Sequence, residues 1–168
     1  MYDSAKPGST LLSRRSALGG IVGAALVAAP IATAASASAA PVAAPSAASL
    51  AQGMAILGMA KSFAGRVRYR WGGTSPRTGF DCSGMTQYVY ARQGIRLPRT
   101  AAAQRAATRR ISRGAARPGD LIFFHRGRST YHVGIYAGGS MMVDAGNPRS
   151  GIRHQRIWSS KVSFGTKR

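Results

Sequence analysis

The chain has 168 residues, which is enough for one domain with a substantial hydrophobic core and too few for two domains of ordinary size. Lys and Arg number 24 against 4 acidic residues, all of them Asp, which gives a formal net charge of +20. This charge predicts an anionic partner, such as nucleic acid, an anionic membrane or an acidic cell-wall polymer. The basic residues are scattered and accompany no nucleic-acid-binding motif, which counts against nucleic acid. The single cysteine excludes an internal disulfide, so the fold depends on packing.

Residues 1–40 have the pattern of an export signal. Arg14 and Arg15 precede a mildly apolar run over residues 19–30, and small residues over 35–40 offer a cleavage site. The alternative is a membrane anchor, but the run is short, rich in Gly and Ala, and interrupted by a proline. The arginine pair resembles a twin-arginine signal, although ordinary signals also contain such pairs. We therefore expect a secreted or cell-wall protein that keeps no stable membrane anchor after cleavage and is separated from nucleic acid by its export.

Helices are predicted in the first half of the remaining chain. An Ala/Pro/Ser-rich linker over residues 41–48 precedes a helix over residues 49–63, which Ser49 caps and Gly65 ends. The apolar residues of this helix recur at helical spacing and predict its buried face: Leu50, Met54, Leu57 and Ala60.

The only cysteine lies at the start of the second predicted helix. Asp81 is a favourable N-cap, and Gly94 fits the position just after the helix end. Cys82 therefore occupies the first turn, where the helix dipole stabilises a thiolate and backbone N–H groups can bind an oxyanion. Such a cysteine is a candidate nucleophile, and the alternative is a small buried apolar residue. A third, short helix over residues 101–107 follows the N-cap Thr100.

Strands are predicted in the second half of the chain. They cover residues 121–124, 132–136 and 141–144, with a weak last strand that includes Ile152 or residues 162–164. Helices that precede antiparallel strands predict an α+β fold, with the N-terminal helices packed on one side of an antiparallel sheet.

His132 is the candidate general base among the three histidines. It opens a strand whose apolar residues face one way, whereas His132 and Gly134 face the other. We expect Gly134 to let another element, such as the Cys82 helix, approach the sheet closely. The alternative for His132 is a hydrogen-bonded structural residue. His125 is interpreted as a loop or surface residue and His154 as a solvated one.

Asp144 is the candidate for orienting the imidazole and fixing its tautomer. A three-residue hairpin loop over residues 137–139 places His132 opposite Asp144 on one face of the sheet. A two-residue loop at 138–139 would instead place His132 opposite Ala145 and turn Asp144 to the other face. We predict the three-residue loop.

Several short motifs occur in order over about residues 50–165. They are Tyr69-Arg70-Trp71-Gly72-Gly73, Phe80-Asp81-Cys82-Ser83-Gly84, Leu97-Pro98-Arg99-Thr100, Pro118-Gly119-Asp120-Leu121, His132-Val133-Gly134-Ile135-Tyr136 and the segment that ends at Asp144. Their combination and spacing resemble the NlpC family of papain-like cell-wall cysteine endopeptidases. The resemblance implies a papain-like catalytic domain over residues 49–168, with its nucleophilic cysteine at a helix N-terminus.

The resemblance also implies a role for each matched residue. Cys82 is the nucleophile, His132 the base and Asp144 the third polar group, at a position where the family often has His and sometimes Glu, Asn or Gln. Tyr69 matches the active-site tyrosine of the family. From the residues alone, Tyr69 is either an oxyanion donor or an aromatic side chain that packs the loop.

Four residues are candidates for substrate binding. Asp81 and Ser83 match positions that bind the free amine of a stem peptide in some members of the family. Trp71 and Arg99 lie in the matched motifs and are the other two candidates.

The usual reaction of the family is hydrolysis of the bond between D-glutamate and a diamino acid, such as diaminopimelate, in peptidoglycan stem peptides. We therefore expect a monomeric cysteine endopeptidase that uses no metal or organic cofactor and binds peptidoglycan and anionic cell-wall polymers. The alternatives are a peptidoglycan amidase or transferase on the same fold, or a catalytically inactive, cationic wall-binding protein. Binding to nucleic acid is not expected.

Overall fold

The computed structural model describes residues 46–168, so the predicted export signal and most of the predicted linker lie outside the described residues. The elements in chain order are α1 (Ala47–Phe63), β1 (Thr74–Ser75), β2 (Gly79–Phe80), α2 (Cys82–Ala91), α3 (Ala101–Ala106), β3 (Arg109–Ile111), β4 (Leu121–Arg126), β5 (Ser129–Gly138), β6 (Met141–Ala145), β7 (Ile152–Arg156) and β8 (Val162–Thr166). Within this range, no helix is both long and apolar enough to cross a membrane.

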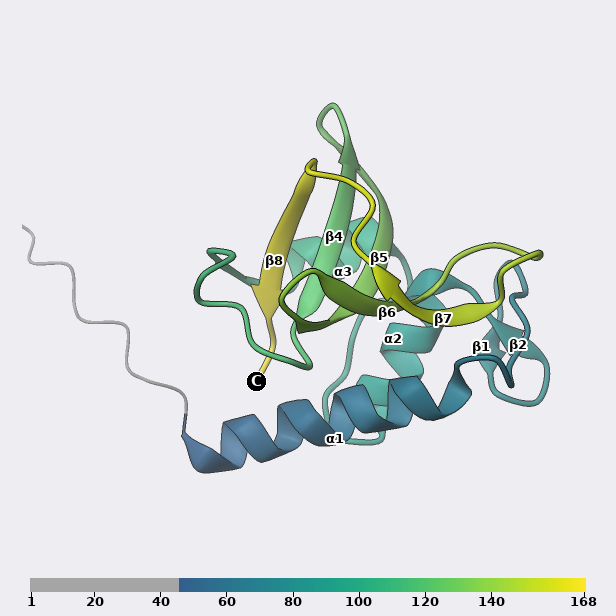
Figure 1. Cartoon of the computed structure of the whole chain (residues 1–168), viewed down its shortest axis with the longest axis horizontal. Helices are drawn as coiled ribbons and strands as arrows, with labels where there is room; N and C mark the ends of the chain where they lie inside the picture. The colour runs from purple at the N-terminus through teal and green to yellow at the C-terminus, as the bar shows by residue number, and fades with distance from the viewer. Residues whose placement is uncertain (1–45) are drawn as a thin grey trace, which may run out of the picture. The chain divides into compact units, whose positions relative to one another are not determined.

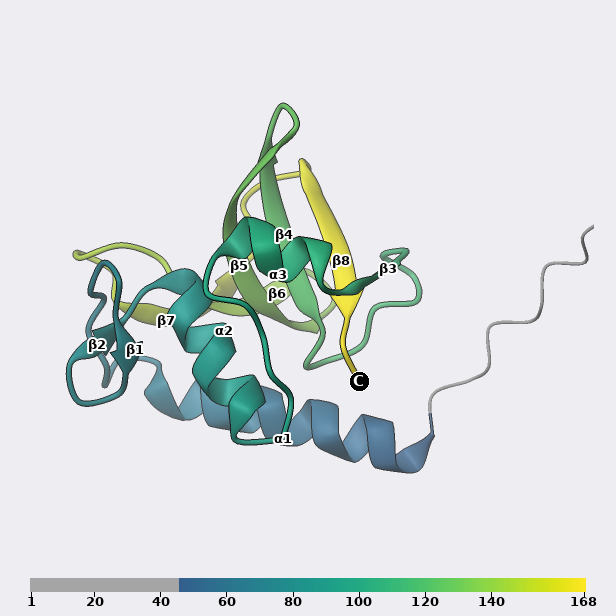
Figure 2. The same cartoon turned by 180° about the vertical axis from the view of Figure 1, so that it is seen from behind.

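Helices precede the main sheet and pack against it, which confirms the predicted α+β fold. The sheet is antiparallel, with the strand order β3-β8-β4-β5-β6-β7, and β1 pairs with β2 in a small separate hairpin. Figure 1 shows β8, β4 and β5 side by side, with β6 and β7 running across them. α2 and α3 lie in front of the sheet in Figure 2, and α1 contacts α2, β5, β6 and β7.

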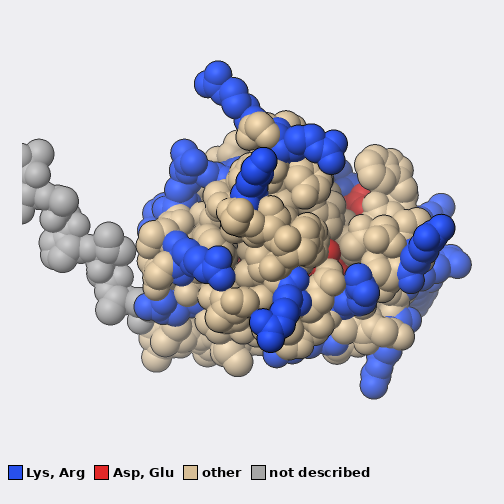
Figure 3. All heavy atoms as spheres, turned by 45° about the horizontal axis from the view of Figure 1, so that its top comes forward, with Lys and Arg blue, Asp and Glu red and all other residues tan. Residues whose placement is uncertain are grey.

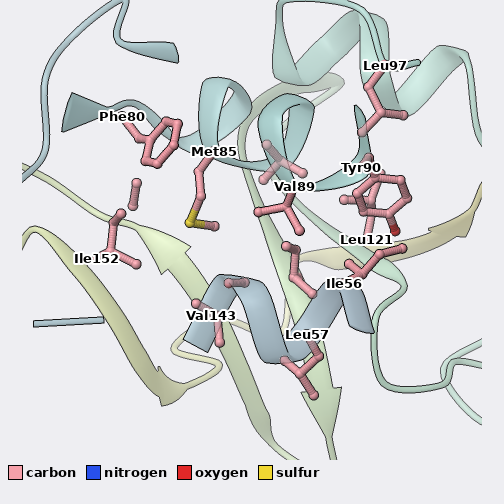
Figure 4. Packing of buried hydrophobic residues seen from close by; sticks show 14 of the residues in the cluster. Ile56, Leu57, Phe80, Met85, Val89, Tyr90, Leu97, Leu121, Val143 and Ile152 are labelled. Carbon is pink, nitrogen blue, oxygen red and sulfur yellow. The ribbon is translucent and has the colours of Figure 1, made fainter. Parts of the chain in front are cut away.

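The larger hydrophobic core lies between the helices and the sheet. Met85 and Val89 of α2 are fully buried there with Val133 of β5 and Val143 of β6. Figure 4 shows the two α2 side chains between the helices and the strands. A second, smaller cluster covers the opposite face of the sheet and contains Ala116, Ile122, Phe124, Tyr136, Met142 and Phe164. The strands are therefore apolar on both faces, which explains the continuous apolar run of β4.

The buried face of α1 agrees with the predicted face only in part, because Leu57 and Ala60 are buried as predicted whereas Leu50 and Met54 are not. Leu50 and Met54 are 40% and 58% exposed, whereas Ile56 is fully buried. The reason is a close backbone approach at Gly53, where a Cβ atom would lie 2.5 Å from the carbonyl oxygen of Pro118. Only glycine allows this contact, and the contact turns a different side of the helix toward the core.

Two of the three predicted helix caps are confirmed. Asp81 caps α2 by accepting a hydrogen bond from a backbone N–H in the first turn, and Thr100 caps α3 in the same way. α1, however, begins at Ala47 within the predicted linker. Its cap is Ser46, whose side chain accepts the N–H of Ser49, so Ser49 is the third residue of the helix and not its cap.

The strand prediction omitted short elements and misplaced one histidine. The β1–β2 hairpin and β3 were not predicted, whereas β7 and β8 occur at the two candidate positions for a last strand. His125 is not a loop residue but lies half-buried in β4, where its ring hydrogen-bonds with Ser163 and Thr130. His154 is exposed on β7, in agreement with the prediction.

The acidic side chains of the described residues are buried and paired. The pairs are Asp81 with Arg99, Asp120 with Arg168 and Asp144 with His132. Figure 3 shows Lys and Arg side chains spread over the visible face, with acidic atoms only in recessed places. The charged side chains on the surface of this part of the chain are therefore almost all cationic.

Candidate active site

Cys82 lies in the first turn of α2, beside a glycine-rich loop. Oδ1 of Asp81 accepts the N–H of Gly84 at 2.7 Å, and Oδ2 accepts the N–H of Gly72 at 2.9 Å. A Cβ atom at Gly84 would clash with the carbonyl oxygen of Gly73, so glycine is required for the loop to lie against the helix start. The half-buried thiol therefore faces the positive end of the helix dipole and the unpaired N–H groups of a helix N-terminus.

His132 and Asp144 form a buried hydrogen-bonded pair beside this thiol. Nε2 of His132 lies 2.8 Å from Oδ2 of Asp144, which leaves Nδ1 available for the thiol of Cys82, a residue that lines the same hollow as His132. The other carboxylate oxygen, Oδ1, accepts a hydrogen bond from Nε2 of Gln155 at 2.7 Å. The Asp144 side chain has no exposed surface, so both of its oxygens depend on these protein partners.

The protonation of His132 follows from its neighbours. Burial acts to lower the pKa of His132, but the hydrogen bond with Asp144 and the interactions with the nearby Cys82 and with the charge of Asp144 raise it to about 9. The imidazole therefore holds two protons at neutral pH. An imidazolium is able to form an ion pair with a thiolate, which is the nucleophilic form of a cysteine.

The predicted hairpin register is wrong, although Asp144 lies on the predicted face. The predicted three-residue loop would pair Tyr136 with Ser140. In the structure Tyr136 pairs with Met142, because a bulge between Tyr136 and Gly138 shifts the register by two residues. Side chains alternate between faces along a strand, so a shift of two residues keeps Asp144 on the face of His132. The two side chains meet diagonally across the strands.

Gly134 makes room for Asp144 and not for the Cys82 helix, which corrects the prediction. A Cβ atom at Gly134 would lie 3.3 Å from the Cβ of Asp144 and 3.1 Å from the carbonyl oxygen of Val143. α2 packs on the opposite face of β5, in the cluster that contains Val133. Gly134 therefore lets β6 bring its carboxylate beside the histidine.

Arg99 is hydrogen-bonded to Asp81 and Ser83, the two residues that were candidates for binding a free amine. Its guanidinium donates to Oδ1 of Asp81 and to Oγ of Ser83, both at 3.0 Å, and also to Oδ2 of Asp81. Burial acts to raise the pKa of Asp81, but the bonds from Arg99 and from the backbone N–H groups of Gly84 and Gly72 lower it overall. Asp81 is thus ionised, and its charge is neutralised by Arg99 beside Cys82.

Two hollows flank Cys82. The first, of about 500 Å³, also contains His132 and Gln155 in its wall, and we call it the His132-side hollow. The second, of about 400 Å³, contains Asp81 and Arg99 in its wall, and we call it the Arg99-side hollow. The two share four wall residues, which are Tyr69, Trp71, Cys82 and Tyr131. An extended chain that lies across the sulfur would therefore place one segment in each hollow.

The two aromatic candidates lie at the junction of these hollows. Trp71 is 86% exposed and forms part of both walls. Tyr69 lies in both walls as well, and burial together with the charges of Cys82 and Asp81 raises its pKa. Tyr69 therefore keeps its hydroxyl proton at neutral pH and can donate it in a hydrogen bond.

All eight candidate residues of the sequence analysis thus lie in or beside one site, and further residues that the sequence did not reveal line it, four of them with large side chains. These are Tyr131, Arg153, Gln155 and Trp158. Arg153 and Gln155 are alternate residues of β7 and therefore lie on one face of the strand. They line the site only because β7 pairs with β6, which contains Asp144. No group of three or more His, Cys, Asp or Glu in residues 46–168 is placed to hold a metal ion.

The sequence also matches a family profile over much of the same region. Residues 65–164, which include every candidate site residue, match the NlpC/P60 family. The chain belongs to the NlpC/P60 family. Its fold agrees, because the crystal structure of the NlpC/p60 domain of the peptidoglycan hydrolase SagA superposes with a TM-score of 0.61 at 34% sequence identity. This superposition covers 69% of the present chain and 98% of the SagA domain.

Curated NlpC/P60 relatives are longer proteins. A probable endopeptidase p60 of Listeria innocua is 48% identical over 103 residues, which cover 61% of this chain and 21% of the relative. The bifunctional muramidase/DL-endopeptidase CwlT of Bacillus subtilis is 46% identical over 105 residues, which cover 58% of this chain and 31% of CwlT. The chain therefore spans between a fifth and a third of the length of these two relatives.

Proposed function

We propose that this NlpC/P60 chain is a cysteine endopeptidase that hydrolyses the peptide bond between D-glutamate and the diamino acid of peptidoglycan stem peptides. The observation that carries the proposal is the arrangement of His132, whose Nε2 bonds Asp144 at 2.8 Å while Cys82 lines the same hollow as the ring. A thiolate at a helix start, an imidazolium and an orienting carboxylate are the groups that acyl transfer through a thioester requires.

Acylation takes place at the sulfur of Cys82, which lies in the wall of both hollows. The sulfur of Cys82 attacks the carbonyl carbon of the D-glutamyl residue, and a C–S bond forms while the carbonyl oxygen becomes an oxyanion. Backbone N–H groups at the start of α2 and the Tyr69 hydroxyl stabilise this oxyanion. The C–N bond then breaks, and the proton on Nδ1 of His132 passes to the leaving amine, which leaves a thioester on Cys82.

Deacylation reverses the direction of proton transfer. His132, now neutral, takes a proton from water as the water oxygen attacks the thioester carbon. The C–S bond breaks, the thiolate of Cys82 returns, and the imidazolium is restored beside it. Asp144 holds the ring in one tautomer and orientation throughout, and Gln155 holds Asp144.

We further propose that residues 1–40 export the protein and that it acts in the cell wall. The arginine pair and the apolar run of the N-terminal segment support export. The cationic surface supports adsorption to a wall that contains phosphate-rich polymers and free carboxylates. Binding to isolated walls should therefore weaken as ionic strength rises, and binding that does not change with salt would contradict the electrostatic explanation.

Mass spectrometry of digested peptidoglycan tests the activity. The purified protein should create a new amino terminus on the diamino acid, and Cys82→Ala should create none while still binding the wall. A new end at another bond would support an amidase or a transferase instead. Digestion that survives in Cys82→Ala would exclude the thioester route, and no digestion by the wild type would leave only the wall-binding alternative.

A further inference from the structure

The two hollows differ in the part of the substrate that each can hold. This step depends on the proposed function. His132 must lie next to the leaving nitrogen in order to protonate it, and His132 lines only the hollow of about 500 Å³. Asp81 and Arg99 line only the other hollow. The D-glutamyl side of the substrate therefore lies in the Arg99-side hollow, and the leaving diamino residue lies in the His132-side hollow.

The His132-side hollow presents one fixed positive charge to the leaving residue. Arg153 is the only Lys or Arg in its wall, and the wall contains no Asp or Glu. The Asp144 side chain has no exposed surface, and its two oxygens are hydrogen-bonded to His132 and Gln155, so its negative charge does not face the hollow. Aromatic side chains, among them Trp158, supply much of the remaining wall.

Arg153 has no carboxylate partner in the described part of the chain. It pairs with Asp144 across β6 and β7, so its side chain leaves the sheet on the face that carries the catalytic pair. Each acidic residue among 46–168 already has another partner, as described above, and Arg153 is exposed. An exposed guanidinium at the edge of a substrate hollow is able to bind a carboxylate with two parallel hydrogen bonds.

We infer that Arg153 binds the side-chain carboxylate of the leaving diamino acid. A diaminopimelate side chain ends in an ammonium and a carboxylate, whereas a lysine side chain ends in an ammonium alone. Arg153 attracts the first and repels the second, and amidation of the carboxylate removes the attraction. The residue is thus a specificity determinant that selects diaminopimelate-type stem peptides with a free side-chain carboxylate.

Three soluble tetrapeptides that differ only in their third residue test this inference. The third residue is diaminopimelate, diaminopimelate amidated on its side chain, or lysine, and kcat/KM is measured for each. We expect the wild type to prefer free diaminopimelate by about 10- to 100-fold, which is the range of one hydrogen-bonded charge pair. Arg153→Gln should reduce this preference to about twofold or less, chiefly by lowering kcat/KM for the free carboxylate. Arg153→Lys keeps the positive charge but cannot form two parallel hydrogen bonds with a carboxylate, so it should give an intermediate preference.

Arg156→Ala is the matched control, because Arg156 is also exposed on β7 but does not line the hollow. It should leave the preference of the wild type unchanged. If the wild type cleaves all three peptides equally, the inference is overturned and the endopeptidase proposal stands. A loss of cleavage of all three alike in both Arg153 variants would also overturn it, since that pattern indicates a structural role. No cleavage of any peptide by the wild type would overturn the proposed function itself, and the inference with it.

Discussion

Gln155 donates a hydrogen bond to Oδ1 of Asp144 at 2.7 Å, while Oδ2 of the same carboxylate bonds His132 at 2.8 Å. Asp144 is fully buried between these partners, so neither oxygen has water as an alternative. Gln155 therefore fixes the carboxylate that fixes the imidazole. It is a positioning residue that acts through Asp144 and His132, and its place on β7 makes a third strand part of the site.

Gln155→Leu should lower kcat by about tenfold and leave KM nearly unchanged, because a freed carboxylate orients His132 less well. The buried oxygen of Asp144 also loses its donor, which should cost about 1–3 kcal/mol of the free energy of unfolding. Steady-state kinetics and urea unfolding measure the two effects. Gln52→Leu is the control, since Gln52 likewise donates one side-chain hydrogen bond, to the carbonyl of Gln93, far from the site. An equal rise in KM would show that Gln155 binds substrate directly.

The raised pKa of His132 predicts how stability depends on pH. The folded-state pKa of about 9 lies above the ordinary 6.5, so the folded chain binds the proton more tightly than the unfolded chain does. The stabilisation is therefore complete below pH 6.5 and is lost as pH rises through about 9. Free energies of unfolding measured across this window should fall in the wild type and should change less in Asp144→Asn, which lacks the negative partner. A wild type that becomes more stable across the window would contradict the assignment.

Arg99→Ala should slow the reaction of Cys82 with iodoacetamide by about three- to tenfold. The variant leaves the Asp81 carboxylate beside the sulfur without its guanidinium, and a second negative charge opposes the thiolate. The pKa of Asp81 should rise for the same reason. Arg96→Ala removes an exposed arginine from the same segment and serves as the control. Alkylation at the wild-type rate in Arg99→Ala would show that the pair does not act on the thiol.

Two alanine substitutions in α1 should have opposite effects on stability. A Cβ at Gly53 would lie 2.5 Å from the carbonyl oxygen of Pro118, so Gly53→Ala should separate α1 from that turn and cost about 1–3 kcal/mol. At Gly58 a Cβ would meet no atom within 4 Å, so Gly58→Ala should gain about 0.5–1 kcal/mol from helix propensity alone. Thermal unfolding of both variants measures the difference. Equal stability of the two would refute the proposed role of the close contact.

The parts of the site that the sequence predicted are those that depend on local signals. Asp81 as an N-cap and Gly94 beyond the helix end both concern a few adjacent residues, and they located Cys82 correctly in the first turn. The strand pattern also placed His132 and Asp144 on one face. This placement is correct although the predicted register is wrong. The bulge after Tyr136 shifts the pairing by two residues, and a shift of two residues leaves each side chain on the same face.

The parts that the sequence did not predict depend on contacts between distant segments. The buried face of α1 is set by Gly53 against Pro118, which are 65 positions apart in the printed sequence, and hydrophobic spacing alone favoured Leu50 and Met54. Gln155 and Arg153 likewise belong to the site only because β7 lies beside β6. A polar residue on an edge strand gives no local sign of such a role.

The shortage of carboxylates on the outside has a practical consequence for handling the protein. Because the acidic residues of the described part are enclosed, excess positive charge faces any solution into which the molecule is released. Although nucleic acid is not expected as a biological partner, nucleic acid from lysed cells should adsorb non-specifically to this exterior during purification and cover the surface that we propose adsorbs to the wall. Preparations should therefore be washed at high salt before any adhesion assay, and an absorbance ratio that reports residual nucleic acid should accompany each measurement.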